Sequence, residues 1–383
     1  MKQLGIYIHI PFCKSKCKYC DFVSFQGIEE KQDKYIECLL KEIEKQNWNE
    51  INNNYNVTTI YIGGGTPSYI NTNHIENILK LLKEKLQNNL NNETEVTIEV
   101  NPGTANIEKL KKYKEAGINR LSIGLQSTNN KLLKEIGRIH TFEHFGDTYQ
   151  NAKEVGFENI NVDLMLALPN QTIQDLKESI EKVLELNPNH ISVYSLILEE
   201  GTQFFRLEQE GKLNLPSEEQ ERQMYWYVKN KLELAGYNHY EISNFAKIGK
   251  ESRHNLNCWN QEEYLGFGLA AHSYFQDKRF SNTSNLELYI KNIEENSQEK
   301  NVEIHENQNI EDKKKEYMLL GLRKIEGVSI SKFKEKFVDN PIYLFKNELS
   351  KLSEENLVEI DGDRIKLTNK GLDFANLVWE EFV

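Results

Sequence analysis

Short strand-like runs alternate with long amphipathic stretches over the first ~200 residues of the chain, and this alternation is its strongest constraint on fold. The runs span residues 6–10, 57–62, 95–100, 118–124, 159–166 and 190–196. Strands separated by helices pair in parallel through right-handed crossovers. The sequence therefore predicts an α/β fold, a partial (β/α)6 TIM-like barrel.

A polar or glycine-containing segment follows each of these strands at its C-terminal end. Parallel α/β barrels gather their active sites at that face, because all the βα loops lie there. The segments contain a cysteine loop after the first strand, then "GGGTPS" (63–68), Glu99, Gln126, Asp163 and residues 195–197. We therefore expect these six loops to form one site.

The cysteine loop reads "PFCKSKCKYCDF" and places Cys13, Cys17 and Cys20 in a C-x3-C-x2-C spacing, although the chain has only five cysteines. A structural zinc site takes four ligands, usually in pairs. Iron–sulfur clusters are held by thiolates, and three thiolates leave one iron of a cubane open for an external ligand. The spacing favours a 4Fe–4S cluster over zinc or redox thiols.

This spacing, with the aromatic Tyr19 before the third cysteine, resembles the signature of the radical S-adenosylmethionine (SAM) family. The resemblance implies a 4Fe–4S cluster whose open iron binds the amino and carboxylate groups of SAM. An electron from that cluster can cleave the sulfonium to a 5′-deoxyadenosyl radical. Cys13, Cys17 and Cys20 are then the cluster ligands.

The segment "GGGTPS" lacks the lysine of a phosphate-binding loop and the spacing of a dinucleotide-binding fingerprint. By itself it is equally compatible with a simple strand-to-helix turn. The resemblance implies that Gly64, Gly65 and Thr66 match the segment that holds the methionine amino group of SAM.

Further cofactor contacts are implied by the resemblance alone. Without it, a carboxylate at a strand end often caps the next helix, and an arginine after "KEIG" is often a surface residue. The residues it implies as SAM contacts are Tyr7, Tyr19, Glu99, Gln126, Arg138, Asp163 and Ile197. Arg138 is suited to the cofactor carboxylate, because a guanidinium binds carboxylates in a bidentate manner.

Longer segments resemble the oxygen-independent coproporphyrinogen oxidase family. They include "IYIHIPFC", "YIGGGTPS", "NRLSIGLQS" and "DLMLALPNQT" within residues 1–205, and the resemblance continues over 240–274. The resemblance implies one of two functions. The first is an enzyme, either a coproporphyrinogen III dehydrogenase or another radical enzyme acting on a tetrapyrrole. The second is a haem chaperone of the HemW type.

Three features favour the haem chaperone. The oxidase carries a fourth cysteine where this chain has Phe22, and an N-terminal arm where only twelve residues precede Cys13. The haem chaperones carry H-N-x-x-Y-W, and residues 254–259 read "HNLNCW". His254 is the expected haem ligand, since imidazole is a common axial ligand. Cys258 replaces the tyrosine and is either a second ligand or a small buried residue.

The charge balance bears on partners. Lys plus Arg total 47 against 59 Asp plus Glu, a net charge of −12, which disfavours nucleic acid as a partner. The expected partners are haem, haem-accepting proteins, including respiratory proteins at a membrane, and an electron donor if the cluster is reduced. Few cysteines and a strand-like N-terminus predict the reducing cytoplasm, with peripheral membrane contact left open.

The remaining chain predicts two further parts. Residues 206–300 are expected to continue and pack on the barrel, which itself covers residues 1–205. A polar stretch at 292–316 indicates a boundary, and two helix patterns and a hairpin over 311–383 predict a winged-helix-like domain. That domain contains 13 Lys or Arg and 15 Asp or Glu residues, so we expect it to contact protein and not DNA.

Overall fold

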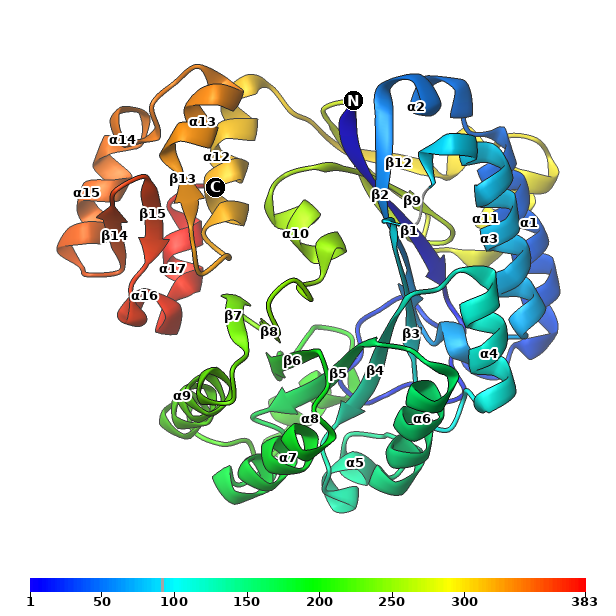
Figure 1. Ribbon diagram of the computed structural model, residues 1–383, viewed down its shortest axis with the longest axis horizontal. Helices are drawn as coiled ribbons and strands as arrows, with labels where there is room; N and C mark the ends of the chain where they lie inside the picture. The colour runs from blue at the N-terminus through cyan, green and yellow to red at the C-terminus, as the bar shows by residue number, and fades with distance from the viewer. Residues whose placement is uncertain (91–92) are drawn as a thin grey trace.

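The computed structural model describes residues 1–90 and 93–383. A curved sheet with helices on its outer face forms the larger part, and a smaller helical part with a three-stranded sheet follows it (Figure 1). The α/β class and the small C-terminal domain predicted from the sequence are confirmed.

Six strands pair in parallel in the order of the chain, as the alternating pattern predicted. They are β1 (Lys2–Ile10), β2 (Tyr55–Gly64), β3 (Glu95–Val100), β4 (Arg120–Gln126), β5 (Asn159–Leu166) and β6 (His190–Ser195). The predicted bounds of the third and fifth strands agree with the structure. The fourth strand is shifted by two residues toward the C-terminus, because Asn119 instead caps the start of β3 through its side chain.

Amphipathic helices cover the outer face of these strands (Figure 1). Thr141 and Thr172 begin two of them with capping boxes, which satisfy exposed backbone N–H groups. The covering helices are α1 (Gln32–Lys45), α2 (Trp48–Asn54), α3 (Thr72–Leu86), α4 (Ile107–Ala116), α5 (Asn130–Glu135), α6 (Phe142–Val155) and α7 (Ile173–Leu186).

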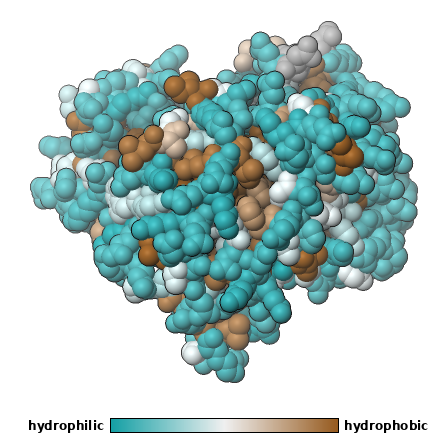
Figure 2. All heavy atoms as spheres, turned by 60° about the horizontal axis from the view of Figure 1, so that its bottom comes forward, coloured by the Kyte–Doolittle hydropathy of each residue, from teal (hydrophilic) through white to brown (hydrophobic). Residues whose placement is uncertain are grey.

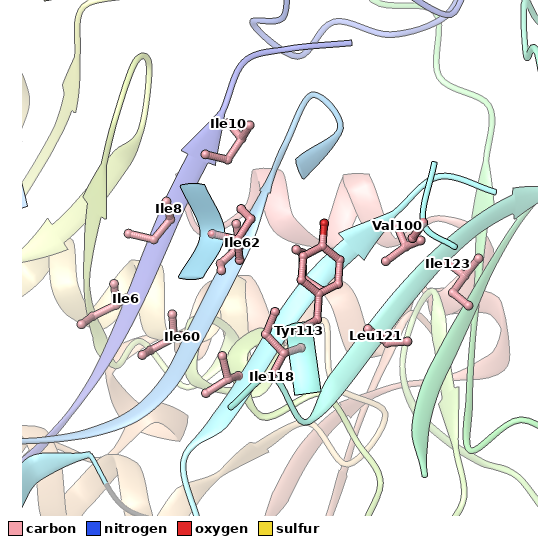
Figure 3. Close-up of a cluster of buried hydrophobic side chains, with 14 of the residues drawn as sticks. Ile6, Ile8, Ile10, Ile60, Ile62, Val100, Tyr113, Ile118, Leu121 and Ile123 are labelled. Carbon is pink, nitrogen blue, oxygen red and sulfur yellow. The ribbon is translucent and has the colours of Figure 1, made fainter. Parts of the chain in front are cut away.

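The main hydrophobic core lies between the sheet and these helices. Figure 3 shows side chains of β1 and β2 beside those of β3, β4 and the α4 region, among them Ile8, Ile62 and Leu121. All three are fully buried. Since these residues alternate along their strands, the opposite face of each strand is left to line the inside of the barrel.

Further strands extend both edges of the parallel sheet. Beside β6 lie β8 (Asn244–Ala246) and β7 (Asn238–Glu241), which follow α8 (Gln203–Gln209) and α9 (Glu218–Leu234). Beside β1 lie β9 (Glu263–Phe267), β10 (His272–Phe275), β11 (Lys278–Asn282) and β12 (Val302–Asn307), with α11 (Leu286–Glu294) between the last two.

Helix α10 (Arg253–Trp259) lies in the chain between β8, which pairs with β6, and β9, which pairs with β1 at the other side of the six strands. It contacts β2, β9 and the first helix of the C-terminal part. Figure 1 shows it on the inner side of the open sheet, facing that C-terminal part. The haem-motif segment predicted at 254–259 is therefore this helix.

The C-terminal part has a hydrophobic core of its own. Its elements are α12 (Ile310–Gly321), β13 (Val328–Ser329), α13 (Ile330–Phe337), α14 (Pro341–Leu344), α15 (Lys346–Glu354), β14 (Val358–Asp361), β15 (Arg364–Leu367), α16 (Asn369–Asp373) and α17 (Ala375–Glu380). The first predicted helix is divided into α12 and α13, because Gly327 turns the chain with φ +70° where a Cβ would collide with the Ile365 carbonyl.

The predicted boundary at 292–316 is not an irregular linker. It contains β12 and the start of α12, so the chain enters the C-terminal part directly from the sheet edge. Among the described residues no helix is both long and apolar enough to cross a membrane.

Candidate functional site

A cavity of about 410 Å³ opens at the C-terminal ends of the parallel strands. Residues from the ends of all six strands, or from the segments that follow them, line it, so the predicted loops and strand ends share one site. The predicted residues on its wall are Cys13, Cys17, Tyr19, Cys20, Gly64, Gly65, Thr66, Glu99, Gln126, Arg138, Asp163 and Ile197. Figure 2 shows apolar side chains grouped near the centre of an otherwise mostly hydrophilic face.

Backbone hydrogen bonds hold the cysteine loop against the end of β2. The Cys13 N–H donates to the Phe25 carbonyl at 2.8 Å, and the Phe25 N–H donates to the Pro11 carbonyl at 2.8 Å. The Thr66 N–H donates to the Phe12 carbonyl at 2.9 Å. The loop is thus fixed at both of its ends, which keeps its thiols at the cavity.

Two glycines of "GGGTPS" lie so close to β1 and the cysteine loop that a side chain would not fit. A Cβ at Gly65 would lie 3.0 Å from the Cys13 sulfur, and a Cβ at Gly64, which has φ +110°, would lie 2.6 Å from the His9 ring. The Gly65 N–H donates to the Ile10 carbonyl at 2.9 Å. These glycines therefore bring β2 against β1 and the first cysteine.

The three cysteines line one cavity. Among residues 1–90 and 93–383, no three His, Cys, Asp or Glu side chains are arranged to hold a single metal ion. The Thr66 hydroxyl lies 3.5 Å from the Cys13 sulfur. Burial raises the pKa of Cys20 to about 11, so its thiolate needs a cation to form at neutral pH.

Glu99 is a buried carboxyl at the end of β3. It accepts hydrogen bonds from the Tyr61 hydroxyl at 2.9 Å and from the Gly64 N–H at 3.1 Å. Burial raises its pKa to about 7, and the nearby charge of Asp163 acts in the same direction. Glu99 is therefore only partly ionised at neutral pH without a cation beside it.

Asp163 lies one strand further along, on β5. It accepts hydrogen bonds from the Asn161 amide at 2.7 Å and from the Ser122 hydroxyl at 3.2 Å. Burial raises its pKa as well, and these hydrogen bonds oppose the shift. The cavity thus contains two partly desolvated carboxyls that are suited to binding a cationic ligand.

Arg138 was predicted to bind a cofactor carboxylate, but its terminal nitrogens are already in use. One lies 3.6 Å from the Cys17 sulfur, and the other donates to the Asn101 side chain at 2.9 Å and to the Gly124 carbonyl. Its Nε has no partner among the described residues. Arg138 thus links the cysteine loop to β4, and two of its five N–H donors, on Nε and Nη1, have no partner among the described residues.

Gln126 and Ile197 line the cavity from the ends of β4 and β6. Gln126 adopts φ +70°, a left-handed conformation that is unusual for a residue other than glycine. Ile197 is 66% exposed and lies at the cavity with the exposed Phe22.

Tyr7 does not line the cavity. Its hydroxyl lies 3.0 Å from His9 Nδ1, and its ring stacks on Tyr61 with centroids 6.3 Å apart. Burial raises its pKa. Tyr19 does line the cavity and packs against a small apolar cluster that includes Leu196 and Leu198.

His254 lies behind the cavity wall, whereas its neighbour Asn255 lines the cavity. The His254 Nδ1 is 2.9 Å from the Thr59 hydroxyl, and its ring stacks on Tyr61 at 5.1 Å between centroids. Burial lowers its pKa to about 4, so the ring is neutral at pH 7. Within the described part of the chain, no residue hydrogen-bonds its Nε2.

Cys258 lies one turn after His254 on α10 and is not among the residues that line the cavity. Burial raises its pKa to about 11, and the charge of Arg279 opposes the shift. By its exposure Cys258 is half-buried, and a haem-ligand role stays a prediction.

Sequence reasoning missed the polar residues that line the inside of the barrel. They are Tyr61, Asn101, Arg120, Ser122, Asn161, Ser192 and Tyr194. A signal for them exists, because polar side chains recur at every second position in "RLSIG" (120–124) and "NINVDL" (159–164). Buried parallel strands are normally apolar on both faces, so this alternation points to a polar interior.

Comparisons with known proteins agree with this geometry. The model of the Radical SAM superfamily matches residues 7–183, and that of the HemN C-terminal domain matches residues 310–374. The structure of coproporphyrinogen III oxidase (HemN) from Escherichia coli covers 100% of this chain and 90% of its own, with a TM-score of 0.86 and 25% identity.

Two curated relatives match over nearly the full length. The heme chaperone HemW of Lactococcus lactis is 39% identical over 382 residues, covering 100% of this chain and 98% of its own. The heme chaperone HemW of Bacillus subtilis is 40% identical over 379 residues, covering 98% of each. The chain therefore belongs to the HemW family, within the radical SAM superfamily.

Proposed function

We propose that this protein is a haem chaperone that binds haem together with a 4Fe–4S cluster and SAM and delivers the haem to acceptor proteins. One observation carries the proposal: a single cavity is lined both by the three cysteines and by Asn255 of α10, the helix that carries "HNLNCW". The names of the full-length relatives support it.

Radical SAM membership implies the cluster and SAM. A reduced cluster supplies an electron, and SAM supplies the sulfonium that this electron can cleave. Cys13, Cys17 and Cys20 would hold the cluster, because thiolates are its usual ligands. Three thiols fit a cluster that keeps one iron open better than a structural zinc ion, which takes four ligands.

The residues above the strand ends would hold SAM. Glu99 and Asp163 offer carboxylates to its cationic groups, and each becomes easier to ionise once a positive charge lies beside it. The remaining proposed contacts are Tyr19, Gly64, Gly65, Thr66, Gln126, the free Nε of Arg138 and Ile197. Tyr7 would act indirectly, through His9 and Tyr61.

His254 would bind the haem iron through Nε2. Its neutral ring provides a free nitrogen, while Thr59 occupies the other one. Because His254 is nine-tenths buried and lies behind the cavity wall, iron can reach it only after α10 shifts. The half-buried Cys258 would become more accessible in the same movement.

The proposed organisation is a SAM and cluster domain over 1–205, a segment packed on it over 206–300, and a protein-contact domain over 311–383. Arg323, in the C-terminal domain, stacks on two rings: Trp259 of α10 and Trp379 of the same domain. The distances from its guanidinium to the two ring centres are 4.4 and 4.8 Å. This contact would couple acceptor binding to α10. The proposed acceptors are haem proteins, some at a membrane, and the proposed location is the cytoplasm.

The second function is oxidation of coproporphyrinogen III, which the HemN-like structure favours. One anaerobic experiment separates the two. One sample of the cluster-loaded protein receives SAM, a reductant and coproporphyrinogen III. A parallel sample of the cluster-loaded protein receives haem. The proposal expects a stable Soret band with haem and no decarboxylated product, whereas turnover without stable haem binding contradicts it.

A further inference from the structure

Arg120 is a buried cation whose guanidinium has no hydrogen-bond partner among the described residues, although its charge acts on the nearby carboxyl of Asp163. Arg120 is the first residue of β4, is 2% exposed and lines the cavity. Its Nε has no hydrogen-bond partner among the described residues. Among the described residues no carboxylate forms an ion pair with it, and no side chain or carbonyl hydrogen-bonds its guanidinium. A buried charge without compensation is costly, so such groups are normally paired.

The neighbours of Arg120 across the sheet are also unsatisfied. Thr97 on β3 and Asn159 on β5 are its register partners, and paired residues point to the same face of a sheet. The Thr97 hydroxyl and the Asn159 side-chain oxygen are buried without hydrogen-bond partners. Three adjacent strands therefore carry a row of polar groups that lack partners inside the barrel.

This row lies at the opposite end of the barrel interior from the cysteines. Arg120 is the first residue of β4, whereas Gln126, at the cysteine end, is the last. Arg120 is also near α10, because its charge lowers the pKa of His254. A ligand that reached Arg120 would therefore lie between the SAM contacts and His254.

The chemistry of the row selects an anion. A guanidinium has five N–H donors in a planar fork that fits a carboxylate, and a hydroxyl adds a sixth donor. The carboxyl of Asp163, whose pKa the charge of Arg120 lowers, already accepts hydrogen bonds from Asn161 and Ser122. Haem carries two propionates, and SAM carries one carboxylate at its methionine end.

We propose that Arg120, assisted by Thr97, binds a propionate of the tetrapyrrole and so places the macrocycle between the cysteine loop and α10. This rests on the proposed haem-binding function. The propionate is favoured over the carboxylate of SAM because Arg120 lies at the end of β4 remote from the cysteines. Arg120 is thus a specificity residue for carboxylated porphyrins, a role separate from that of Arg138.

The test compares haem with haem dimethyl ester, whose propionates are neutral. Full-length, cluster-loaded protein is titrated with each by its Soret band, as wild type, Arg120→Met, Thr97→Val and Arg206→Met. Arg206 lies exposed on α8, away from the cavity, and is the matched control. The wild type and the control are expected to bind haem at least about tenfold more tightly than the ester.

Arg120→Met should lose this discrimination, and Thr97→Val should reduce it, while SAM affinity stays unchanged. The thermal midpoint of ligand-free Arg120→Met should change little, because the variant removes no hydrogen bond or ion pair of the described residues and only the charge that acts on Asp163. Unchanged discrimination in Arg120→Met, or equal binding of haem and ester by the wild type, overturns the inference alone. A variant that loses SAM affinity and keeps haem affinity assigns Arg120 to SAM and also overturns it. A wild type that binds neither porphyrin overturns the proposed function as well.

Discussion

The hydroxyl of Thr59 and Nδ1 of His254 lie 2.9 Å apart inside the barrel. This contact joins β2 to α10, two elements almost two hundred residues apart in the chain. It occupies one ring nitrogen and leaves Nε2 without a partner among the described residues. Such second contacts fix the tautomer and orientation of metal-binding histidines. Thr59 is therefore the positioning residue for the proposed haem ligand.

Replacing Thr59 with valine should weaken haem binding by about tenfold, because the imidazole loses its fixed orientation while its own atoms are unchanged. Soret titration of the cluster-loaded protein measures the affinity. Thr148→Val is the matched control, since Thr148 is buried on α6 with hydrogen bonds of its own. Equal losses in the two variants would show a general effect on folding and not on His254.

SAM affinity should rise with pH near neutrality. Burial raises the Glu99 pKa to about 7, so the carboxyl is mostly protonated at pH 6 and mostly ionised at pH 8. Only the ionised form attracts the cationic groups of SAM, which predicts about tenfold tighter binding at pH 8 than at pH 6. SAM affinity is measured by calorimetry in Glu99→Gln and in Glu108→Gln, an exposed change on α4. The affinity of Glu99→Gln should lose the pH dependence that comes from Glu99, whereas that of Glu108→Gln should keep it. Identical pH profiles in both variants would remove Glu99 from the cofactor site.

Cys17→Ala should prevent assembly of a stable 4Fe–4S cluster. Cys38→Ala should not, because Cys38 is fully buried in α1 and does not line the cavity. Iron and sulfide content after anaerobic reconstitution, with the electron paramagnetic resonance of the reduced protein, measures the difference. Full cluster content in Cys17→Ala would contradict the ligand assignment.

Arg323→Ala should loosen α10. The guanidinium stacks on Trp259 and Trp379, and its removal also leaves Glu241 without the positive charge that lowers its pKa. We expect a stability loss of about 2 kcal/mol or more in urea denaturation, because desolvated cation–π contacts are worth that much. Arg364→Ala, which removes a half-exposed ion pair with Glu326, should cost about 1 kcal/mol or less.

The same variant tests the proposed movement of α10. Amide hydrogen exchange in Arg253–Trp259 should accelerate in Arg323→Ala, and haem should associate faster. Faster exchange with an unchanged rate of haem association would contradict a gating role for this helix.

Local signals made much of this protein readable from its sequence. The strands follow from short apolar runs between amphipathic helices, and Cys13, Cys17 and Cys20 follow from their spacing in one loop. The position of His254 beside Thr59 and Tyr61 could not be predicted, because it depends on where α10 lies on the inner side of the sheet. The contacts of Arg138 with the cysteine loop and β4 depend on tertiary structure. The lack of hydrogen bonds to Arg120 depends on strand register, which places Thr97, Arg120 and Asn159 in one row.

Haem binding by the cluster-loaded protein, with and without His254, tests the central claim most directly. The measurement is a Soret titration of wild type, His254→Ala and His74→Ala, the last a control that pairs with Asp33 away from the cavity. The account predicts one haem per chain in the wild type and the control, with the spectrum altered and the affinity lost in His254→Ala. An unchanged Soret band and affinity in His254→Ala would contradict it.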